Sequence, residues 1–440
     1  RNFTHMLQVL ELGIDLPDAF DIKGHIYEDQ QELEIKTSIP YIRTSGTNME
    51  NIKIALDNHN EQLELSLSVL NHLPKDNPTA AKLGDIKAGI KLSAKNDALD
   101  LLVNLENTDK VRNEGIIHAA SQLSRNNDTV QLDIQILPTN FILNDSSWNI
   151  SEANIMYIPA KKIIDVHNFA LYTDYQSIAI NGRASVSDMD SLNVALHNIN
   201  MDYLLSYTEA NEAISIMGPA TGEAHIYGLF SEPMLEAQAQ IPNGGLNGVY
   251  LGDVTAEAKL DRENKTILID GQIVDSTNHL VAQVAGKVIP RDKWWGLDIA
   301  CDSVDLHFID FWTNEIIANP QGRAYGNVKV EGQRHKVWVT GRALAKDAQI
   351  TIPQIGTTFY LTDSIFLDST AILFPNITMY DQYGNQGSFS GHVWHENFMD
   401  ITYDLKAQAN NMMVMNLPAD QQSLFYGQVY GTGDVHIHGD

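Results

Sequence analysis

Cysteine is almost absent from this sequence: Cys301 is the single one among 440 residues. One cysteine excludes an internal disulfide framework and every zinc site built from cysteine pairs. Cys301 alternates with Leu297 and Ile299 in an apolar pattern, so we expect a buried structural thiol rather than a reactive one. The sequence therefore gives no indication of cysteine chemistry.

Positive charge is also scarce. The chain has 29 Lys and Arg residues against 56 Asp and Glu residues, which gives a net charge of −27. Nucleic acids and anionic lipid surfaces both bind to basic patches, so this composition argues against either as a direct partner. We expect no nucleic-acid partner, and no affinity that depends mainly on electrostatics.

Long apolar runs are absent as well. No stretch approaches the roughly 18 uninterrupted apolar residues of a membrane-spanning helix, and no signal-peptide pattern opens the chain. The 43% content of hydrophobic residues is nevertheless enough to bury a sizeable core. Because Arg1 begins as if inside a domain and Asp440 directly follows a strand pattern, we expect an internal segment whose membrane anchor lies outside this chain.

Alternation of apolar and polar residues is what the sequence has in abundance. It occurs, for example, at residues 52–56, 63–69, 130–136, 178–180, 254–260 and 267–273. Strict alternation indicates strands with one apolar and one solvated face, which is typical of antiparallel sheets. Turn signals separate these runs about every 10 to 14 residues, so we predict some 35 strands arranged as successive hairpins.

Helix signals are few. Residues 201–207, 306–312 and 418–424 occupy corresponding places along the chain, and each is predicted to form one or two helical turns. Residues 113–125 carry apolar positions at helical spacing but fit a strand equally well, so both assignments stay open for this segment.

A short pattern occurs three times, at residues 221–228, 325–332 and 432–439. Each copy has a glycine, a turn residue, an apolar–polar–apolar triplet and a second glycine, and each is preceded by an alternating run at 192–196, 297–301 or 401–405. The first glycines, Gly222, Gly326 and Gly433, lie 104 and 107 residues apart. This spacing predicts one continuous array: an N-terminal segment 1–128 followed by repeat units 129–228, 229–332 and 333–440.

So many strands exceed what a flat sheet or a sandwich holds. A twisted open sheet rarely exceeds about 10 strands without curling, and an alternating sheet curls into either a filled solenoid or an open trough. The chain lacks the short regular repeat of a tight β-helix, which favours the trough. We therefore predict an all-β fold: an elongated, repetitive antiparallel sheet, on the order of 150 Å long, curled into a groove (a β-taco) with an apolar interior and a few short helices.

The apolar positions of the alternating runs are the predicted lining of the groove, whereas His225, Lys329 and His436 are expected to face water. The predicted lining residues are Leu63, Leu65, Leu67, Leu132, Ile134, Ile136, Ile178, Ile180, Val194, Leu196, Ala224, Ile226, Ile267, Ile269, Leu297, Ile299, Val328, Val330, Ile401, Tyr403, Leu405, Val435 and Ile437.

Several segments also resemble a known family. Residues 355–363, 377–385, 391–398 and 425–427 are similar to the C-terminal region of the TamB family, the translocation and assembly module subunit, in its Bacteroidetes-type form. Residues 148–151, 178–183 and 192–200 resemble the repeated units of the same family. The similarity covers roughly residues 130–440, and it lies in the ordered series of segments rather than in any one motif.

This resemblance implies an AsmA-like periplasmic protein of the Gram-negative envelope, anchored in the inner membrane by an N-terminal helix that this chain lacks. It further implies a partner barrel in the outer membrane, TamA-like or BamA-like. Members of the family form a long β-groove thought to carry phospholipid acyl chains between the membranes, and they are linked to outer-membrane protein assembly. The implied function is a lipid conduit and not an enzyme.

Catalytic patterns are weak. His392, His395 and Glu396 do not have the order of a zinc-protease motif, and on a strand the two histidines point to opposite faces. His436 and His438 share a face, but the other two repeats have no such pair, so a solvated surface explains them better than a metal site.

Two further patterns are equally isolated. Asp400 and Asp404 lie on one strand face like a glycosidase carboxylate pair, but their equivalents in the other repeats are not a carboxylate pair. Trp294 with Trp295 suggests a sugar platform, but a single aromatic pair in a turn is weak evidence for one. We predict no catalytic residue, no metal and no cofactor. The alternative to a lipid conduit is a structural or adhesive β-solenoid, or a polysaccharide-active β-helix protein, with a filled core.

Overall fold

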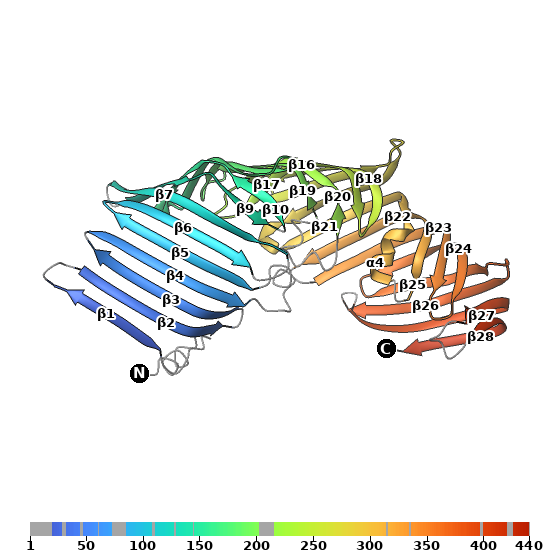
Figure 1. Cartoon of the computed structure of the whole chain (residues 1–440). Helices are drawn as coiled ribbons and strands as arrows, with labels where there is room; N and C mark the ends of the chain where they lie inside the picture. Colours follow the sequence, from blue (N-terminus) through green and yellow to red (C-terminus); the bar gives the residue numbers. More distant parts are fainter. Residues whose placement is uncertain are drawn as a thin grey trace. The chain divides into compact units, whose positions relative to one another are not determined.

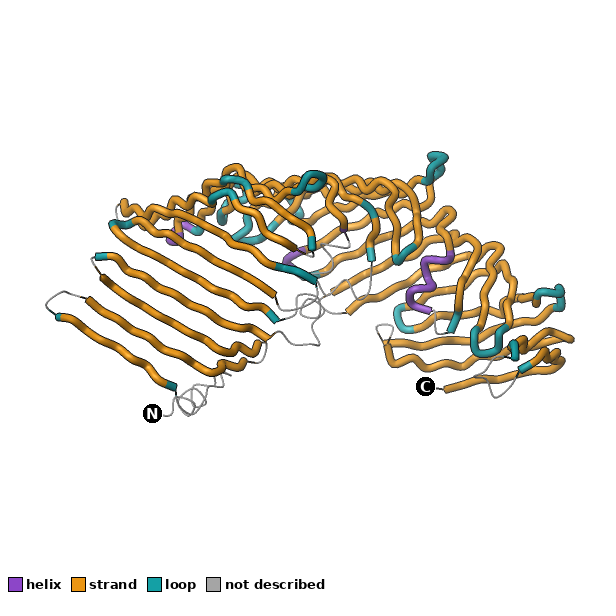
Figure 2. Tube along the Cα trace, in the orientation of Figure 1, coloured by secondary structure: helices purple, strands orange, loops and turns teal. Residues whose placement is uncertain are grey.

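The structure is a computed structural model that describes residues 20–28, 32–44, 47–59, 61–72, 85–107, 111–126, 129–143, 145–201, 215–313, 316–333, 336–396, 399–419 and 426–439. These residues form 28 strands, all assigned to one antiparallel sheet, and the helical segments among them are at most four residues long (Figure 2). They pack into two compact units: unit 1 comprises the described parts of 1–213 and 221–233, and unit 2 those of 214–220 and 234–440.

Unit 1 is a meander in which consecutive strands lie side by side (Figure 1). Its elements are β1 (Asp21–Tyr27), β2 (Glu32–Thr44), β3 (Thr47–His59), β4 (Gln62–His72), β5 (Ile86–Lys95), β6 (Ala98–Asn107), β7 (Glu114–Asn126), β8 (Thr129–Ile136), β9 (Thr139–Leu143), β10 (Ser146–Ile150), β11 (Ala153–Ile158), η1 (Pro159–Lys161), β12 (Ile163–Tyr172), β13 (Ser177–Ala184), β14 (Ser191–Asn200) and most of β16 (Pro219–Tyr227).

Between β7 and β12 the meander contains interrupted strands. β7 pairs with both β8 and β9, and β12 pairs with both β11 and β10. Pro138 lies between β8 and β9, where it offers no backbone N–H to the ladder. The four short strands therefore act as two long strands, each with a break in the middle.

Unit 2 continues the same pattern of antiparallel neighbours, from β15–β17 through β27–β28. Its elements are β15 (Ile216–Met217), β17 (Met234–Leu246), β18 (Val249–Asp261), β19 (Thr266–Val274), β20 (Leu280–Ile289), η3 (Pro290–Asp292), β21 (Trp294–Asp305), η4 (Leu306–Ile309), α4 (Asp310–Thr313), β22 (Ala318–Gln333), β23 (Lys336–Ile352), β24 (Thr357–Asp368), β25 (Ala371–Asp381), β26 (Gln386–Glu396), β27 (Met399–Leu417) and β28 (Gly427–Gly439).

The all-β class and the antiparallel hairpin order are confirmed. The described residues hold 28 strands rather than about 35, because many strands are longer than the expected spacing allows, up to 19 residues in β27. Residues 113–125, left open between helix and strand, form β7. The helical turns expected at 306–312 are present as η4 and α4, whereas most of 201–207 and 418–424 lies outside the described residues.

The repeated glycine pattern is always the second strand of a pair. Its three copies lie in β16, β22 and β28, which pair with β14, β21 and β27, the strands that hold the preceding alternating runs. The registers differ between two of the copies: Gly326 lies opposite Cys301, the last residue of the run 297–301, whereas Gly433 lies opposite Ala409, four residues beyond the run 401–405. The packing of the described residues divides the chain into two units and not into the four predicted segments, so all the repeat limits stay predictions.

Bulges interrupt the ladders at recurring asparagines. Asn168, Asn198 and Asn411 have φ values of 62°, 55° and 51°, and register shifts occur next to Asn168 and Asn411. Each freed N–H donates to a side chain of the adjoining strand; for Asn198 and Asn411 the acceptors are Thr221 Oγ1 at 3.0 Å and Thr432 Oγ1 at 2.9 Å. A bulge bends its strand, and these two threonines belong to the repeated pattern.

Candidate functional site: the apolar face of the sheet

In unit 1 the strand registers bring the predicted lining residues together on one face. Directly opposed residues of an antiparallel pair share a face, and Leu67 lies opposite Ile54 on β3 and Ile90 on β5. Following the partners from β4 to β14 keeps the same face throughout. The predicted residues that share it are Leu63, Leu65, Leu67, Leu132, Ile134, Ile136, Ile178, Ile180, Val194 and Leu196.

Unit 2 has a corresponding apolar face. Leu297 lies opposite Val330, and Leu405 lies opposite Ile437. The directly opposed residues of neighbouring strands stay on this face from β19 to β28, and several of them are glycine or alanine. The predicted residues that share it are Ile267, Ile269, Leu297, Ile299, Val328, Val330, Ile401, Tyr403, Leu405, Val435 and Ile437.

The contact of His225 shows which face of the sheet its neighbours Ala224 and Ile226 of β16 occupy. The Nδ1 atom of His225 lies 2.6 Å from Oδ1 of Asn193, on the face opposite that of Val194. Because side chains alternate along a strand, Ala224 and Ile226 point to the Val194 side. His225 is half-buried by this contact rather than fully in water, whereas Lys329 and His436 are exposed as expected.

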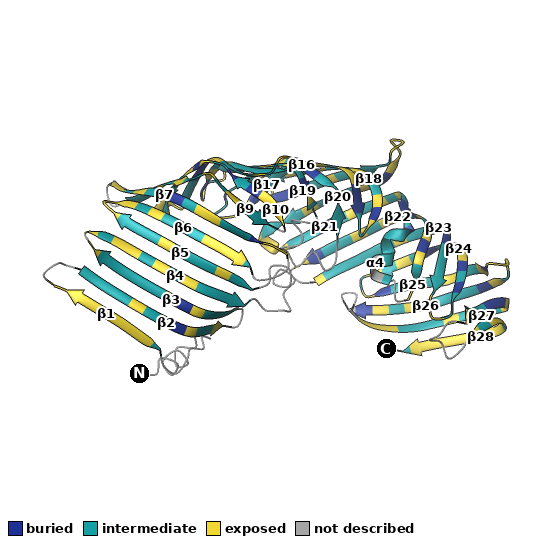
Figure 3. Ribbon diagram, in the orientation of Figure 1, coloured by how far each residue is buried: buried dark blue, intermediate teal, exposed yellow. Residues whose placement is uncertain are grey.

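Most of the apolar face is only half covered. Of the predicted lining residues only Ile267 is buried, and most of the others are intermediate, as the alternating bands in Figure 3 illustrate. Four are exposed, which differs from the inward position expected of them: Leu63 at 38%, Ile401 at 46%, Val435 at 54% and Ile437 at 49%. Val435 and Ile437 lie on β28, whose one strand neighbour among the described residues is β27.

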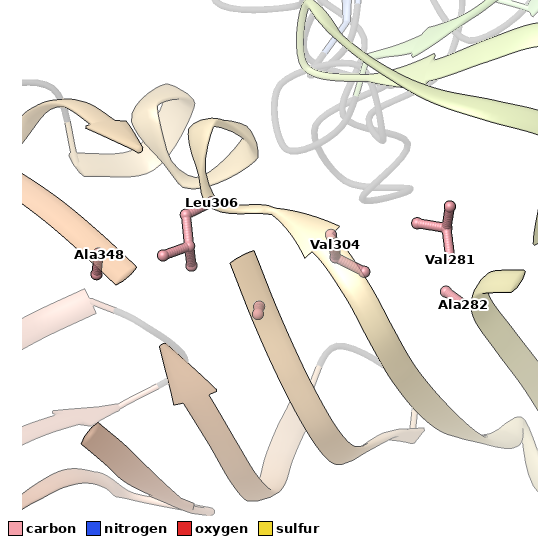
Figure 4. Packing of buried hydrophobic residues seen from close by; sticks show 6 residues of the cluster. Val281, Ala282, Val304, Leu306 and Ala348 are labelled. Carbon is pink, nitrogen blue, oxygen red and sulfur yellow. The ribbon is translucent and has the colours of Figure 1, made fainter. Parts of the chain in front are cut away.

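A cluster of buried hydrophobic residues lies in unit 2, where the helical segment covers part of the apolar face. Leu306 of η4 packs with Val304 and Ala348 (Figure 4), and Phe308 joins the same cluster. The buried members are Val281, Ala282, Val304, Leu306, Ala324 and Ala348. In this part of the unit the apolar side chains form an ordinary packed core.

The opposite face is polar and carries ion pairs both between strands and within a strand. Arg183 donates to Asp165 across β12 and β13 at 2.7 Å, and Lys329 lies 3.0 Å from Glu331 along β22. His436 lies 2.9 Å from Asp404 of β27. The sheet therefore has one solvated face and one aliphatic face, as the alternation predicted.

Cys301 lies on the apolar face between Ala282 and Gly326, and burial raises the pKa of its thiol. The thiolate is the reactive form of cysteine, so this position disfavours nucleophilic chemistry at neutral pH. The expectation of a structural thiol agrees with this environment.

The histidines and carboxylates of the sequence patterns lie in different surroundings. His392 is exposed and stacks on Trp394 at 5.3 Å, whereas His395 is buried, and burial lowers its pKa. The rings of His436 and His438 are neighbours at 5.5 Å, but in the described part of the chain no three His, Cys, Asp or Glu side chains are placed to hold a metal ion. Asp400 lies in a left-handed conformation with φ of 48°.

The tryptophan pair does not form a platform either. Trp295 shares the apolar face with its partners Val288 and Gly332, and its indole lies where a Cβ of Gly332 would be. Trp294 lies on the other face, over Gly296 and 5.7 Å from Lys287 Nζ. The two rings are on opposite sides of the sheet.

Sequence reasoning missed the bulges and a recurring hairpin turn. Ile-Pro begins the turn after β11, β20 and β23, and the turn ends on a left-handed residue: Lys162, Lys293 or Gly356. Proline presets the first φ of such a turn. The Ile-Pro pairs between alternating runs are a signal that could have located these turns.

None of the described helices is long and apolar enough to span a membrane. A comparison with protein-family models, with curated proteins and with solved structures finds no match for this chain. Its family therefore remains a prediction from the sequence resemblance.

Proposed function

We propose that this chain is a segment of a TamB-like periplasmic protein that carries phospholipid between the inner and outer membranes and takes part in outer-membrane biogenesis. The observation that carries the proposal is an aliphatic face, shared by consecutive strands of each unit, whose side chains are mostly only half-buried. A filled solenoid core would bury these residues from both sides, so the structural or polysaccharide-active alternative is less well supported.

The physical chemistry of the face suits an acyl chain. Exposing a methylene group to water costs about 0.8 kcal/mol, so leucine, isoleucine and valine side chains along a path keep a lipid tail out of water. A uniform aliphatic wall offers no single deep site, and a tail can slide along it. The bulges bend the strands, which lets the sheet curl around its apolar face into a groove.

The cellular setting follows from the resemblance alone. In this proposal an N-terminal anchor outside the chain holds the protein in the inner membrane, and a TamA-like or BamA-like barrel receives it at the outer membrane. The lipid head group faces solvent, and the acyl chains contact the apolar face. No step of the proposal requires a catalytic residue, a metal or a cofactor.

The proposal is tested by a charge placed on the apolar face. Ile269→Asp and Val330→Asp put a carboxylate on the proposed lipid path in unit 2, where both residues are half-buried. A half-open face lets the new carboxylate reach water, so we expect the melting temperature to stay within about 3 °C of the parent, while co-purified phospholipid in native mass spectrometry falls about fivefold or more.

Leu268→Asp is the matched control. Leu268 neighbours Ile269 on β19, is 45% exposed, and faces the polar side opposite Lys259 and Lys287. This variant should keep the parental amount of lipid. A parent that never captures phospholipid, or an Ile269→Asp protein that is folded and captures as much as the parent, would contradict the proposal; unfolding of both apolar-face variants would favour the filled-core alternative.

A further inference from the structure

A depression of about 720 Å³ lies on the polar face of β1 to β6, on the side opposite the proposed lipid path. Its charged lining residues are five lysines, Lys23, Lys36, Lys53, Lys87 and Lys91, and a single acid, Asp21. The chain as a whole has nearly twice as many acidic as basic residues. A local basic cluster is compatible with this composition, because net charge averages over the entire surface.

The strand register assembles this cluster from residues far apart in the sequence. Lys23 lies opposite Lys36, Lys53 opposite Ser68, and Lys91 opposite Ser66. Neighbouring strands lie about 4.8 Å apart, so five strands spread the ammonium groups over roughly 19 Å. This span is several times the size of a single phosphate group.

Short side chains form the floor of the depression. Ser38, Ala55, Ser66, Ser68 and Gly89 lie among the long lysines, so the hollow results from the difference in side-chain length. The side chain of Asn104 lies over Gly89, where a Cβ would be 2.3 Å from its Oδ1 atom. Ile54, Leu67 and Ile90 also line the depression, although their places in the ladder put them on the opposite face. The serine hydroxyl groups and the Asn104 amide group on the floor offer hydrogen-bond donors to an anion.

Three of the five lysines have no acidic partner among the described residues: Lys23, Lys53 and Lys91. Lys36 is hydrogen-bonded to Glu34, and Lys87 Nζ lies 3.6 Å from Glu106. Ammonium groups gathered on one face repel each other, and an anion bound between them relieves this repulsion. Within the described part of the chain, these three ammonium groups are therefore available to pair with an added anion.

We propose that this lysine-lined depression binds a ligand that carries two or more phosphate groups. Lysine binds phosphate as a point charge without a fixed geometry, and the spread of the ammonium groups suits several phosphates better than one. The phosphates could belong to a lipid head group or to a soluble polyphosphate, since the recognising chemistry is the same. The site uses the polar face, so it does not rest on the proposed lipid path.

Two probes test the site. Inorganic tripolyphosphate is titrated into the purified chain by calorimetry, and flotation measures binding to phosphatidylcholine vesicles with about 30 mol% cardiolipin, a lipid with two phosphates. Vesicles of phosphatidylcholine alone control for binding through the apolar face. We expect binding to at least one phosphate probe at low salt and its loss at about 0.5 M NaCl, because salt screens the lysines.

Two variants locate the binding. The double variant Lys53→Gln with Lys91→Gln should weaken it about tenfold, whereas Lys161→Gln with Lys336→Gln, which removes the same charge at exposed positions elsewhere, should leave it unchanged. Ser68→Phe fills the floor without changing charge and should also weaken binding. Circular dichroism checks that each variant is folded.

Each outcome decides the proposal. Tripolyphosphate binding that depends on Lys53 and Lys91 supports a soluble ligand, and cardiolipin binding alone with the same dependence supports a lipid head group. Absence of binding to both probes overturns the proposal. So does binding that the control pair weakens as much as the Lys53 and Lys91 pair.

Discussion

At the scale of single residues, Asp381 is a carboxylate that the fold holds in place. It is buried at the start of the turn after β25 and accepts hydrogen bonds from the backbone N–H groups of Tyr383, Asn385 and Met413 at 2.8 to 2.9 Å. The Asn385 amide group donates a fourth at 2.9 Å. Burial alone would raise the pKa of Asp381, but these donors more than offset it and hold the pKa below its usual value.

We expect Asp381→Asn to lower the free energy of unfolding at pH 7 by about 3 kcal/mol. The carboxylate accepts hydrogen bonds from several N–H groups, whereas the asparagine amide places its own NH₂ group against some of these donors. The depressed pKa means that the stabilisation is fully present above about pH 4 and is lost as the pH falls through the folded-state pKa. Urea unfolding at several pH values should therefore show a weaker acid dependence in the variant.

Asp275→Asn is the control for this change, since Asp275 also accepts hydrogen bonds within a turn but is not buried. It should cost about 1 kcal/mol or less. Equal losses at the two positions would show that the burial of Asp381 does not matter.

At the scale of elements, the repeated pattern places glycines in two different surroundings. Gly326 of β22 has φ of 136°, and a Cβ built there would lie 2.2 Å from the carbonyl oxygen of Arg342 on β23. Gly433 of β28 occupies the same place in its repeat with φ of 149°, but nothing lies within 4 Å of its Cβ position. A side chain at either position would be strained by the backbone conformation. Only at position 326 would it also overlap with a neighbouring strand.

We expect Gly326→Ala to destabilise unit 2 by about 3 kcal/mol or more, and Gly433→Ala by about 1 kcal/mol, the share due to backbone strain alone. Urea unfolding followed by tryptophan fluorescence measures both, because five of the six tryptophans lie in unit 2. Similar losses in the two variants would mean that β23 yields to the added methyl group.

Strands and their faces could be predicted from the sequence, because a period of two is a local property. Leu297 and Ile299 could thus be assigned to the same face as Val328 and Val330. The bulges could not, because they depend on the neighbouring strand: at the bulge next to Asn411, the freed backbone N–H needs an acceptor such as Thr432 of β28. The exposure of Val435 could not be predicted either, since it depends on what lies beside β28.

At the scale of the whole molecule, the two faces of the sheet separate two kinds of chemistry. Net charge and composition describe the polar face only on average. They therefore gave no sign of the lysine cluster, which the pairing of the strands between residues 23 and 91 brings together. The apolar face, by contrast, could be predicted from the sequence alone, because every alternating run contributes to it. The central claim is that this face, and not the polar one, contacts the acyl chains of the lipid.

Site-specific photo-crosslinking to phospholipid tests this claim most directly. A benzophenone side chain is introduced at single positions along β8 and β21, on the apolar face at Ile134, Ile136, Leu297 and Ile299, and on the polar face at Asp133, Gln135, Asp298 and Ala300. Because side chains alternate along a strand, the account predicts lipid adducts with a period of two in both units, high at the apolar positions and low at their neighbours. Equal adduct yields on the two faces, or none at any position, would contradict it.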